Sequence, residues 1–478
     1  MSTTLTNTSR ETDAAGAPKL RGSLGVASIV FIVVAAASPL GVIGGPVPLG
    51  IANGNGTGFP FTYLVVTGVL LLFAVGFTTA TPLVTAAGAF FAYVAKGLGR
   101  SAGLGAAFAA LLSYLALEAG VFGLFGPGVG ELLQSYGLPE LPWWIYAAVG
   151  FAVVSALGYF NINLSGKVLG VLLVAEVAIV VVLDAVVVAQ GGGPEGFSTG
   201  IVTPAEIVSG APGFAILFAI LSFVGFEATA VFRDEAREPE RTIPKATYIA
   251  LVLIGVFYAF SSWVLITANG DSVVVERAAE NSGTILTTTT EAYLGALGGH
   301  IIQVLFVTSL FACILSFHNI ASRYFFALAS KGVLARGLGS VHPRHGSPSR
   351  ASAATSITVA VLVALAAVLG LDPIDQFYTW LGGISSVGVV LLLVLTSVAV
   401  LVLLRTERAR VGLWRASVAP ALGLTGLVAF FIVILFNLPV LVGESSYGPF
   451  SWGILVLFAL AFAAGPVVAR VRAPRDLD

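Results

Sequence analysis

The chain alternates long apolar runs with short polar gaps along its 478 residues. A helix needs about 20 mostly apolar residues to span a bilayer. The segments that meet this length lie near Leu24–Ile51, Pro60–Ala80, Ser101–Leu132, Pro142–Phe160, Ser165–Gln190, Pro212–Phe232, Ala246–Ala268, Ile301–Ser330, Ser352–Leu371, Gln376–Leu404, Trp414–Leu438 and Phe450–Ala469. Strands of a β-barrel would instead alternate over about ten residues. The pattern therefore predicts an all-α integral membrane protein with twelve transmembrane helices.

The composition agrees with a chain embedded in a lipid bilayer. Hydrophobic residues make up 57% of it and charged residues only 10%, whereas a soluble domain is about a quarter charged. So much apolar surface cannot all be buried in one water-soluble core. The net charge of −1 gives no reason to expect nucleic acid as a partner. The single cysteine, Cys313, excludes an internal disulfide and a multi-thiolate metal site.

The distribution of Lys and Arg predicts the orientation. Of the 23 cationic residues, 22 fall in the two tails and in one set of alternate loops, and only Arg277 falls in the other set. Positive charge stays on the cytoplasmic side during insertion. The 18 Arg against 5 Lys, with much Ala, Gly and Val, suit a GC-rich bacterial genome. We therefore expect a multi-pass protein of a bacterial cytoplasmic membrane, with both termini in the cytoplasm.

Two of the predicted helices are interrupted. Helix 1 carries Pro39 within a glycine-rich stretch, and helix 6 carries Gly225 in Leu221–Ala228. Proline lacks a backbone N–H, and glycine adopts non-helical dihedrals cheaply. Helices 1 and 6 are five apart, so helices 1–5 and 6–10 would be corresponding halves. Paired interruptions in two halves indicate a midplane binding site of a secondary transporter. Simple packing kinks are the alternative, because Gly and Pro are frequent in membrane helices.

Three motifs carry a resemblance to the amino acid–polyamine–organocation superfamily of permeases. They are Gly88–Gly99, Phe223–Glu227 with Glu235–Ala246, and Phe317–Arg323 leading to His342–Pro348. The likeness covers about residues 22–405 and implies the leucine-transporter (LeuT) fold, with two inverted five-helix repeats plus two extra helices. It also implies alternating access and amino acids or related amines as substrates. We expect a disordered cytoplasmic tail at 1–22, the ten-helix transport core at 23–405, the two additional helices at 406–470 and a cytoplasmic tail at 471–478.

The broken helices suggest how a zwitterion is held. Free N–H groups at a helix start suit a carboxylate, and freed carbonyls accept from an ammonium, so little formal protein charge is needed. The resemblance implies that amides around Ser38, Leu40 and Gly41 bind the substrate carboxylate. The resemblance also implies that backbone carbonyls near the breaks bind the substrate amine and that an aromatic side chain lies near the substrate. Pro39 contributes no amide, so which N–H groups serve stays open. The remaining implied substrate-binding residues are Ala37, Tyr114, Phe223, Val224 and Gly225.

Four acidic residues lie inside predicted helices, where acids are costly and functional by default. The resemblance makes Glu227, directly after the helix 6 break, a coupling or gating residue. Capping of the following half-helix is its alternative role. Glu118 lies one turn after Tyr114 and is a further coupling candidate. Asp184 is near the outer end of helix 5, where we expect it to be solvated.

Glu176 departs from the family pattern. It stands where several proton-dependent members have a lysine that is thought to replace a sodium ion between helices 1, 5 and 8. Glutamate cannot act as a fixed cation. It could bind a proton itself, or help bind sodium with Ser316 and helix 1 carbonyls, since hard cations favour oxygen ligands. On helix 8, His318 could titrate near neutral pH or be a hydrogen-bonded structural residue.

No motif in the sequence indicates an enzyme or a bound cofactor. A Walker A pattern, a dinucleotide fingerprint and a catalytic triad are absent from it, and His342 and His345 lie in a basic loop without acidic neighbours, which argues against a metal site. We predict a secondary active importer of amino acids or related amines, coupled to a proton. The alternatives are a sodium symporter or an amino-acid exchanger. The remote alternatives are a channel, which would need a continuous polar pore, and a membrane sensor, which would need an appended soluble domain.

Overall fold

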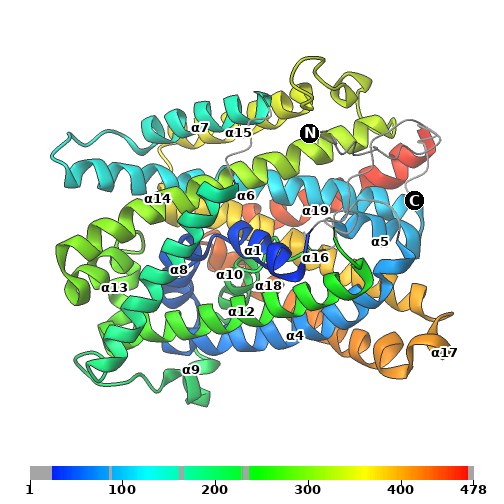
Figure 1. Ribbon diagram of the computed structural model, residues 1–478. Coiled ribbons are helices and arrows are strands. Elements are labelled where there is room, and N and C mark those ends of the chain that lie inside the picture. Colours follow the sequence, from blue (N-terminus) through cyan, green and yellow to red (C-terminus); the bar gives the residue numbers. More distant parts are fainter. Residues whose placement is uncertain (1–23, 85–88, 161–165, 228, 230–235, 472–478) are drawn as a thin grey trace, which may run out of the picture.

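The computed structural model describes residues 24–84, 89–160, 166–227, 229 and 236–471. Within them the secondary structure is helical apart from two isolated bridges. The long helices lie side by side in one body (Figure 1). They are α4 (Phe59–Ala80), α6 (Arg100–Ser135), α7 (Trp143–Phe160), α8 (Gly166–Ala189), α12 (Pro239–Asn269), α14 (Ile285–Ser330), α15 (Ser349–Leu369), α16 (Thr379–Leu404), α18 (Ala419–Leu441) and α19 (Pro449–Val471).

The helices match the predicted segments closely. Among the described residues, eleven are long and apolar enough to cross a membrane, and α10 (Pro212–Leu221) is a further short apolar helix. Predicted helix 6 corresponds to α10 and the turns after it, but its remainder lies outside the described residues. The predicted tails lie outside them as well. The all-helical architecture is therefore confirmed, while the count of twelve spans stays a prediction.

Several helical segments were not predicted from hydropathy. They are α5 (Ala89–Leu98), α13 (Val274–Glu280), the polar first turns of α12, and the part of α14 before Gly295. Gly295 adopts φ 74° and ψ 178° and divides α14 there. The predicted start of helix 8 at Ile301 is therefore late. Most of these segments carry charged or hydroxyl side chains, so an apolar-run criterion overlooks them although their backbone is helical.

Both predicted helix interruptions are present. The first helix divides into α1 (Val26–Ala36), α2 (Pro39–Gly44) and α3 (Pro46–Gly50). Between α1 and α2, Ser38 adopts a left-handed conformation with φ 50°, which a non-glycine residue rarely takes. After α10 the chain forms turns from Ser222 to Glu227, and Gly225 has φ 111°. Such irregular backbone at membrane depth must be satisfied by protein or water rather than lipid.

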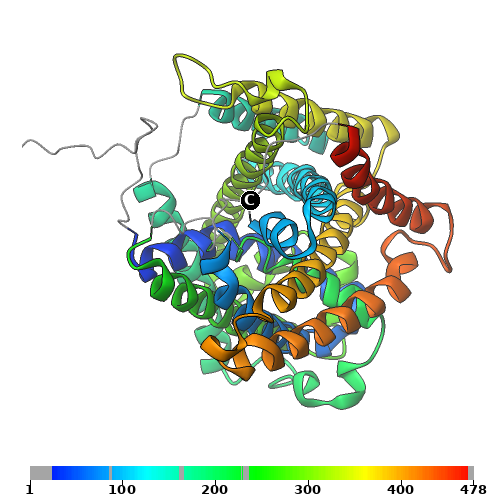
Figure 2. The same ribbon diagram turned by 90° about the vertical axis from the view of Figure 1, so that its right-hand side faces the viewer.

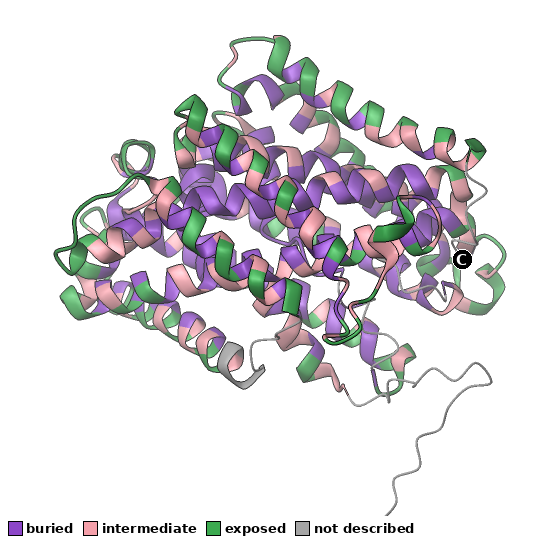
Figure 3. Ribbon diagram, turned by 90° about the horizontal axis from the view of Figure 1, so that it is seen from above, coloured by how far each residue is buried: buried purple, intermediate pink, exposed green. Residues whose placement is uncertain are grey.

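The core of the bundle surrounds these breaks. In the most apolar stretch of α6, 89% of residues are buried, against 17% in α19. Buried residues concentrate at the centre and exposed ones at the periphery (Figure 3). Seen from a second direction, α18 and α19 lie at the outside of the bundle (Figure 2). Their exposed side chains include Phe436 and Leu460, and such apolar surface fits contact with lipid chains.

The two ends of the bundle differ in charge. The short helix α13, which carries Arg277, lies at one end, while α5 and α17 (Arg408–Val411) lie at the other (Figure 1). Lys96 belongs to α5, and Arg408 and Arg410 belong to α17. The arrangement keeps these cations on one side, as the alternation of loops requires. The cytoplasmic placement of that side stays a prediction.

Candidate substrate and ion-coupling site

The break in helix 1 is held by a serine on α14. Ser38 Oγ lies 2.8 Å from Ser309 Oγ and donates to the Ser309 carbonyl oxygen at 3.2 Å. The backbone N–H of Gly41 donates to Ser309 Oγ at 3.4 Å. The regular helical hydrogen bonding is interrupted here, because Pro39 has no N–H and the chain turns at Ser38. The Ser38 hydroxyl and the Gly41 N–H therefore need partners outside helix 1. Ser309 supplies the partners instead.

Glu176 joins this break from α8. Its carboxylate accepts a hydrogen bond of 2.6 Å from Ser309 Oγ and lies beside the backbone N–H of Leu40. The side chain is buried. The predicted meeting of helices 1, 5 and 8 at this residue is therefore present. The serine that bonds Glu176 is Ser309, whereas the hydroxyl of Ser316, the expected helper in sodium binding, donates to the Ala312 carbonyl in its own helix. Ser309 lies seven residues earlier, which is two turns along the same face.

The break in helix 6 is held by its own glutamate. Glu227 Oε2 accepts the Gly225 amide at 2.9 Å, and Glu227 Oε1 accepts the Tyr114 hydroxyl at 2.7 Å. The Glu227 side chain is buried. It thus satisfies irregular backbone within the break and also connects helix 6 to α6, while its capping of the following half-helix stays a prediction. Residues 228 and 230–235, where the sequence predicts the following half-helix, lie outside the described residues.

A small cavity lies between the two breaks. It offers about 40 Å³ to the centres of water molecules, which is room for a few waters. Ala37, Ser38 and Gly41 line it from helix 1, and Val224 lines it from the helix 6 break. The other side chains that line it, all uncharged, are Ala36, Val42, Pro46, Leu117, Val121, Leu124, Leu221, Leu310, Cys313, Phe317 and Tyr378.

The structure divides the predicted substrate-binding residues into two groups. Ala37, Ser38, Gly41 and Val224 line the cavity as described. The remaining residues do not line it. The Tyr114 hydroxyl and the Gly225 amide bond with Glu227, and the Leu40 amide lies beside Glu176. The carbonyl of Phe223 accepts the Phe226 amide at 3.2 Å. The carbonyl of Ala37 accepts the Tyr258 hydroxyl at 3.2 Å.

Sequence reasoning missed most of the apolar lining. Leu117, Val121 and Leu124 follow Tyr114 at helical spacing, three, seven and ten residues on. Residues at such intervals share one face of a helix. The position of Tyr114 could therefore have indicated these three. Leu310, Cys313 and Phe317 on α14 repeat the same spacing, but no sequence signal pointed to their face.

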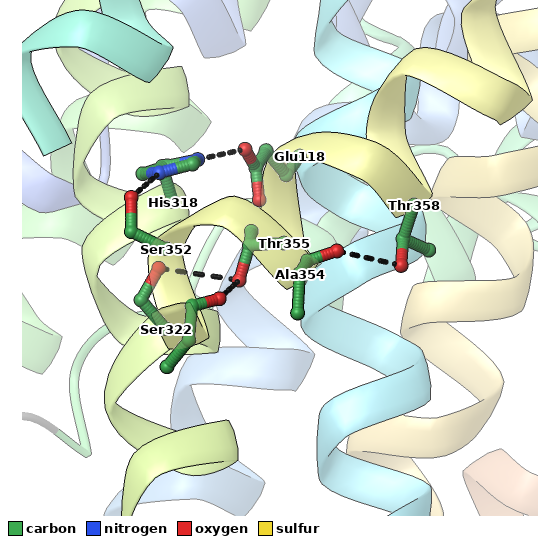
Figure 4. Close-up of polar contacts among 8 residues, drawn as sticks. Glu118, His318, Ser322, Ser352, Ala354, Thr355 and Thr358 are labelled. Carbon is green, nitrogen blue, oxygen red and sulfur yellow. Dashed lines mark hydrogen bonds and ion pairs between the residues drawn. The ribbon is translucent and has the colours of Figure 1, made fainter. Parts of the chain in front are cut away.

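Glu118 belongs to a separate buried cluster. Its Oε1 lies 2.7 Å from His318 Nδ1, and His318 Nε2 lies 2.9 Å from Ser352 Oγ (Figure 4). The three residues come from α6, α14 and α15. All three are about 1% exposed. Glu118 therefore does not line the cavity, although Tyr114, one turn before it, contacts Glu227.

The prediction for Asp184 was wrong. The residue is buried, and its Oδ2 accepts a 2.7 Å hydrogen bond from Ser261 Oγ on α12. Hydropathy placed it near a helix end, but α8 packs against α12 there and encloses the carboxylate. A buried acid without a hydrogen-bond donor would be costly, and Ser261 supplies the donor.

Comparison with known proteins gives a family match over most of the chain. A family model described as "Amino acid permease" matches residues 24–461. The aromatic amino acid transport protein AroP of Escherichia coli O6:H1 is 31% identical over 146 residues, covering 29% of this chain and 32% of AroP. The low-affinity putrescine importer PlaP of Escherichia coli K12 is 24% identical over 258 residues, or 52% of this chain and 54% of PlaP.

Two further likenesses concern a shorter stretch and the fold. The serine/threonine exchanger SteT of Bacillus subtilis is 29% identical over 145 residues, covering 28% of this chain and 31% of SteT. The match thus spans about a third of AroP and SteT and about half of PlaP. Among solved structures, a manganese transporter from Eremococcus coleocola superposes with a TM-score of 0.55 at 14% identity, covering 94% of this chain and 96% of that one. At that identity the likeness concerns the fold alone.

Proposed function

Because the chain belongs to the amino acid permease family, we propose that it imports amino acids across a bacterial cytoplasmic membrane by alternating access, driven by protons. Relatives named for aromatic amino acids, putrescine, and serine or threonine support a substrate from the amino acids or amines. All of these relatives are named as transport proteins, importers or exchangers. This supports a carrier over a channel, a sensor or an enzyme.

The cavity favours a neutral amino acid with an apolar side chain. Leu117, Val121 and Phe317 line it together with residues of the two breaks, and no charged side chain of the described residues lines it. The second ammonium of a diamine would lose its hydration there without a carboxylate partner in the lining. A leucine or phenylalanine side chain would meet surfaces of its own polarity. We therefore expect such a zwitterion rather than a diamine to be the substrate.

One observation carries the proton coupling: the buried Glu176 carboxylate accepts the Ser309 hydroxyl at the break in helix 1 and lies beside the Leu40 N–H. Leu40 is among the donors that the resemblance implies for the substrate carboxylate. Two carboxylates at one donor group repel each other, and protonation of one relieves the repulsion. A proton on Glu176 would remove its charge from beside the amide. Substrate and proton would then bind together.

The transport cycle follows from this competition. A proton from outside neutralises Glu176, and the substrate carboxylate takes over the amides at the start of α2. After the site opens to the cytoplasm, water accepts the proton, and the restored Glu176 carboxylate displaces the substrate. A zwitterion has no net charge, so each cycle carries one positive charge inward. Uptake should therefore respond to membrane potential as well as to the pH gradient.

A sodium ion is the second candidate for the coupling ion. The Glu176 carboxylate and the hydroxyls of Ser309 and Ser38 bring oxygen atoms together between helices 1, 5 and 8. Oxygen atoms are the ligands that hard cations favour. Under this alternative Glu176 would stay ionised, and sodium would bind beside it. The two alternatives differ in which gradient drives uptake.

Uptake by the purified full chain in liposomes tests the proposal. In sodium-free buffer, an inward pH gradient should drive accumulation of labelled phenylalanine or leucine, an inside-negative potential should increase it, and putrescine should accumulate poorly. Accumulation only after sodium is added would assign coupling to sodium. Transport only against preloaded substrate would identify an exchanger. Failure of every amino acid in a full panel would contradict the proposed substrate class.

A further inference from the structure

Glu118, His318 and Ser352 form a hydrogen-bonded cluster within the core, apart from Glu176. Figure 4 shows the His318 ring between the Glu118 carboxylate and the Ser352 hydroxyl. The Nδ1···Oε1 distance is 2.7 Å and the Nε2···Oγ distance is 2.9 Å. An acid and an imidazole enclosed together in a membrane protein are costly unless they are paired or functional.

The hydrogen-bonding capacity of the cluster suits two protonation states. Neutral His318 can donate from Nδ1 to Glu118 and accept the Ser352 hydroxyl proton at Nε2. The imidazolium can donate from both nitrogens, and Ser352 Oγ then accepts. Only the hydroxyl hydrogen has to turn, so the heavy atoms can keep their places. Both ring nitrogens are satisfied in either state.

One acceptor of the cluster remains unpaired. Glu118 Oε2 is buried and has no hydrogen-bond partner among the residues that the structure describes. A buried carboxylate oxygen without a donor carries a desolvation cost. A purely structural link between α6 and α14 would be made as well by a neutral amide, which avoids this charge. A buried carboxylate charge that the neutral imidazole leaves uncompensated therefore favours a proton on the cluster for part of its working cycle.

The surroundings of the ring are closely fitted. A Cβ at Gly158 of α7 would lie 2.6 Å from the His318 ring and 3.0 Å from Ser352 Oγ. Gly158 is two residues before the end of α7, and Ser352 is three residues after the start of α15. The cluster thus lies near one end of both helices. The charge distribution predicts that this end faces the cytoplasm.

The other side of the cluster leads to the broken helices. Tyr114 lies one turn before Glu118 on α6, and its hydroxyl donates to Glu227. Its ring stacks on Phe317, the neighbour of His318, with centroids 6.1 Å apart. The cluster is therefore placed between the helix 6 break and the ends of α7 and α15.

Few other charges lie on the surrounding elements. In the described part of the chain, none of them is hydrogen bonded or ion-paired to the cluster. Helices α7 and α16 carry no charged residue, although α7 carries two tyrosines. The remaining charged residues, His300 included, are Arg100 and Glu131 on α6, Glu291, His300 and Arg323 on α14, Arg350 on α15, and Lys167, Glu176 and Asp184 on the adjoining α8.

We propose that Glu118, His318 and Ser352 form a second proton-binding site, which exchanges its proton with water at the ends of α7 and α15. Without that proton the cluster is a carboxylate and a neutral imidazole. With it the cluster is a carboxylate–imidazolium pair, and its net charge rises from −1 to 0. The link of this site to transport rests on the proposed proton coupling, but proton binding itself does not.

Nitrogen NMR of the full chain in liposomes, labelled with ¹⁵N-histidine, tests the site directly. The His318 signal is identified by its loss in His318→Gln. We expect it to show both the neutral and the imidazolium forms when the pH is varied. Glu118→Gln should move this conversion to lower pH, because the imidazolium loses its counter-charge. Ser322→Ala is the matched control, since its hydroxyl bonds Thr355 at 3.2 Å across the same helix pair without touching the ring.

A second variant and a transport readout complete the test. Ser352→Ala should also move the conversion to lower pH. The hydrogen bond from the imidazolium N–H to Ser352 is stronger than the bond that the neutral ring nitrogen accepts, so removing the hydroxyl destabilises the imidazolium more. The pH at which substrate exchange changes should move with the His318 signal. One unchanging His318 form at every pH tested, or a conversion unaffected by both Glu118→Gln and Ser352→Ala, would overturn the proposal. Proton-independent transport beside a titrating His318 would refute only the proposed coupling.

Discussion

The carboxylate of Glu176 lies beside the backbone N–H of Leu40, directly after the break in helix 1. A residue of α8 therefore faces a donor that the resemblance implies for the carboxylate of the substrate. The contact gives Glu176 a part in substrate binding as well as in ion coupling. A substitution of Glu176 should therefore affect both substrate binding and ion coupling.

The first prediction concerns Glu176→Gln. The amide mimics the protonated carboxyl but cannot release a proton, so pH-driven accumulation should be lost while substrate exchange persists. Accumulation and counterflow in liposomes measure the two properties separately. Asp184→Asn is the matched control, because Asp184 is a buried acid on the same helix that bonds Ser261 away from the breaks. Retained accumulation in Glu176→Gln would exclude Glu176 as the carrier of the proton.

The second prediction uses the only cysteine. Cys313 lines the cavity, so a small methanethiosulfonate reagent that reaches it should block transport, and saturating substrate should slow the reaction. Cys313→Ala should transport normally and resist the reagent. Labelling that proceeds equally fast with and without substrate would show that the substrate does not occupy this cavity.

The third prediction concerns Gly225, which has φ 111° in the helix 6 break. Gly225→Leu should weaken substrate binding about tenfold or more, since a side chain in such backbone costs about 1–3 kcal/mol and must be accommodated at the site. Membrane insertion should be unchanged. Gly453→Leu on α19 is the control, because a Cβ there meets nothing within 4 Å. Equal loss of binding in both variants would point to general instability.

The fourth prediction concerns both charged ends of the substrate. If backbone groups at the two breaks hold a zwitterion, the methyl ester and the N-acetyl derivative should each compete at least about tenfold more weakly than the parent amino acid, because each loses one charge-assisted contact. Inhibition constants for uptake provide the measurement. An ester as potent as the parent would contradict binding of the carboxylate near α2.

The fifth prediction concerns orientation. In a Cys313→Ala background, Glu276→Cys on α13 should react with a membrane-impermeant maleimide in intact cells, whereas Val341→Cys should not. Both positions are exposed, and the charge distribution assigns them to opposite sides. Ser347 would be a poor reporter because it is buried and its hydroxyl donates to the Tyr159 carbonyl. The reverse labelling pattern would invert the predicted topology.

Hydropathy and intrinsic backbone chemistry made the membrane fold predictable from the sequence. The apolar runs mark where helices lie, because each must match the thickness of the bilayer. Pro39 and Gly225 mark the two breaks, because one cannot donate a hydrogen bond and the other tolerates positive φ. These are properties of single residues and their neighbours. Similarly, the acids at 118, 176 and 227 stand out because charge is rare in apolar segments.

The sequence by itself thus determined the helical membrane architecture, the positions of the two breaks and which acids lie within apolar segments. Only the tertiary structure decided their partners. Ser309 lies 133 residues from Glu176, and His318 lies 200 residues from Glu118. Hydropathy does not reveal which face of an apolar helix turns inward, so it could not choose Ser309 over Ser316 or enclose Asp184. Those choices depend on how helices pack, because a buried polar group must find its donor among whatever side chains the packing brings within reach.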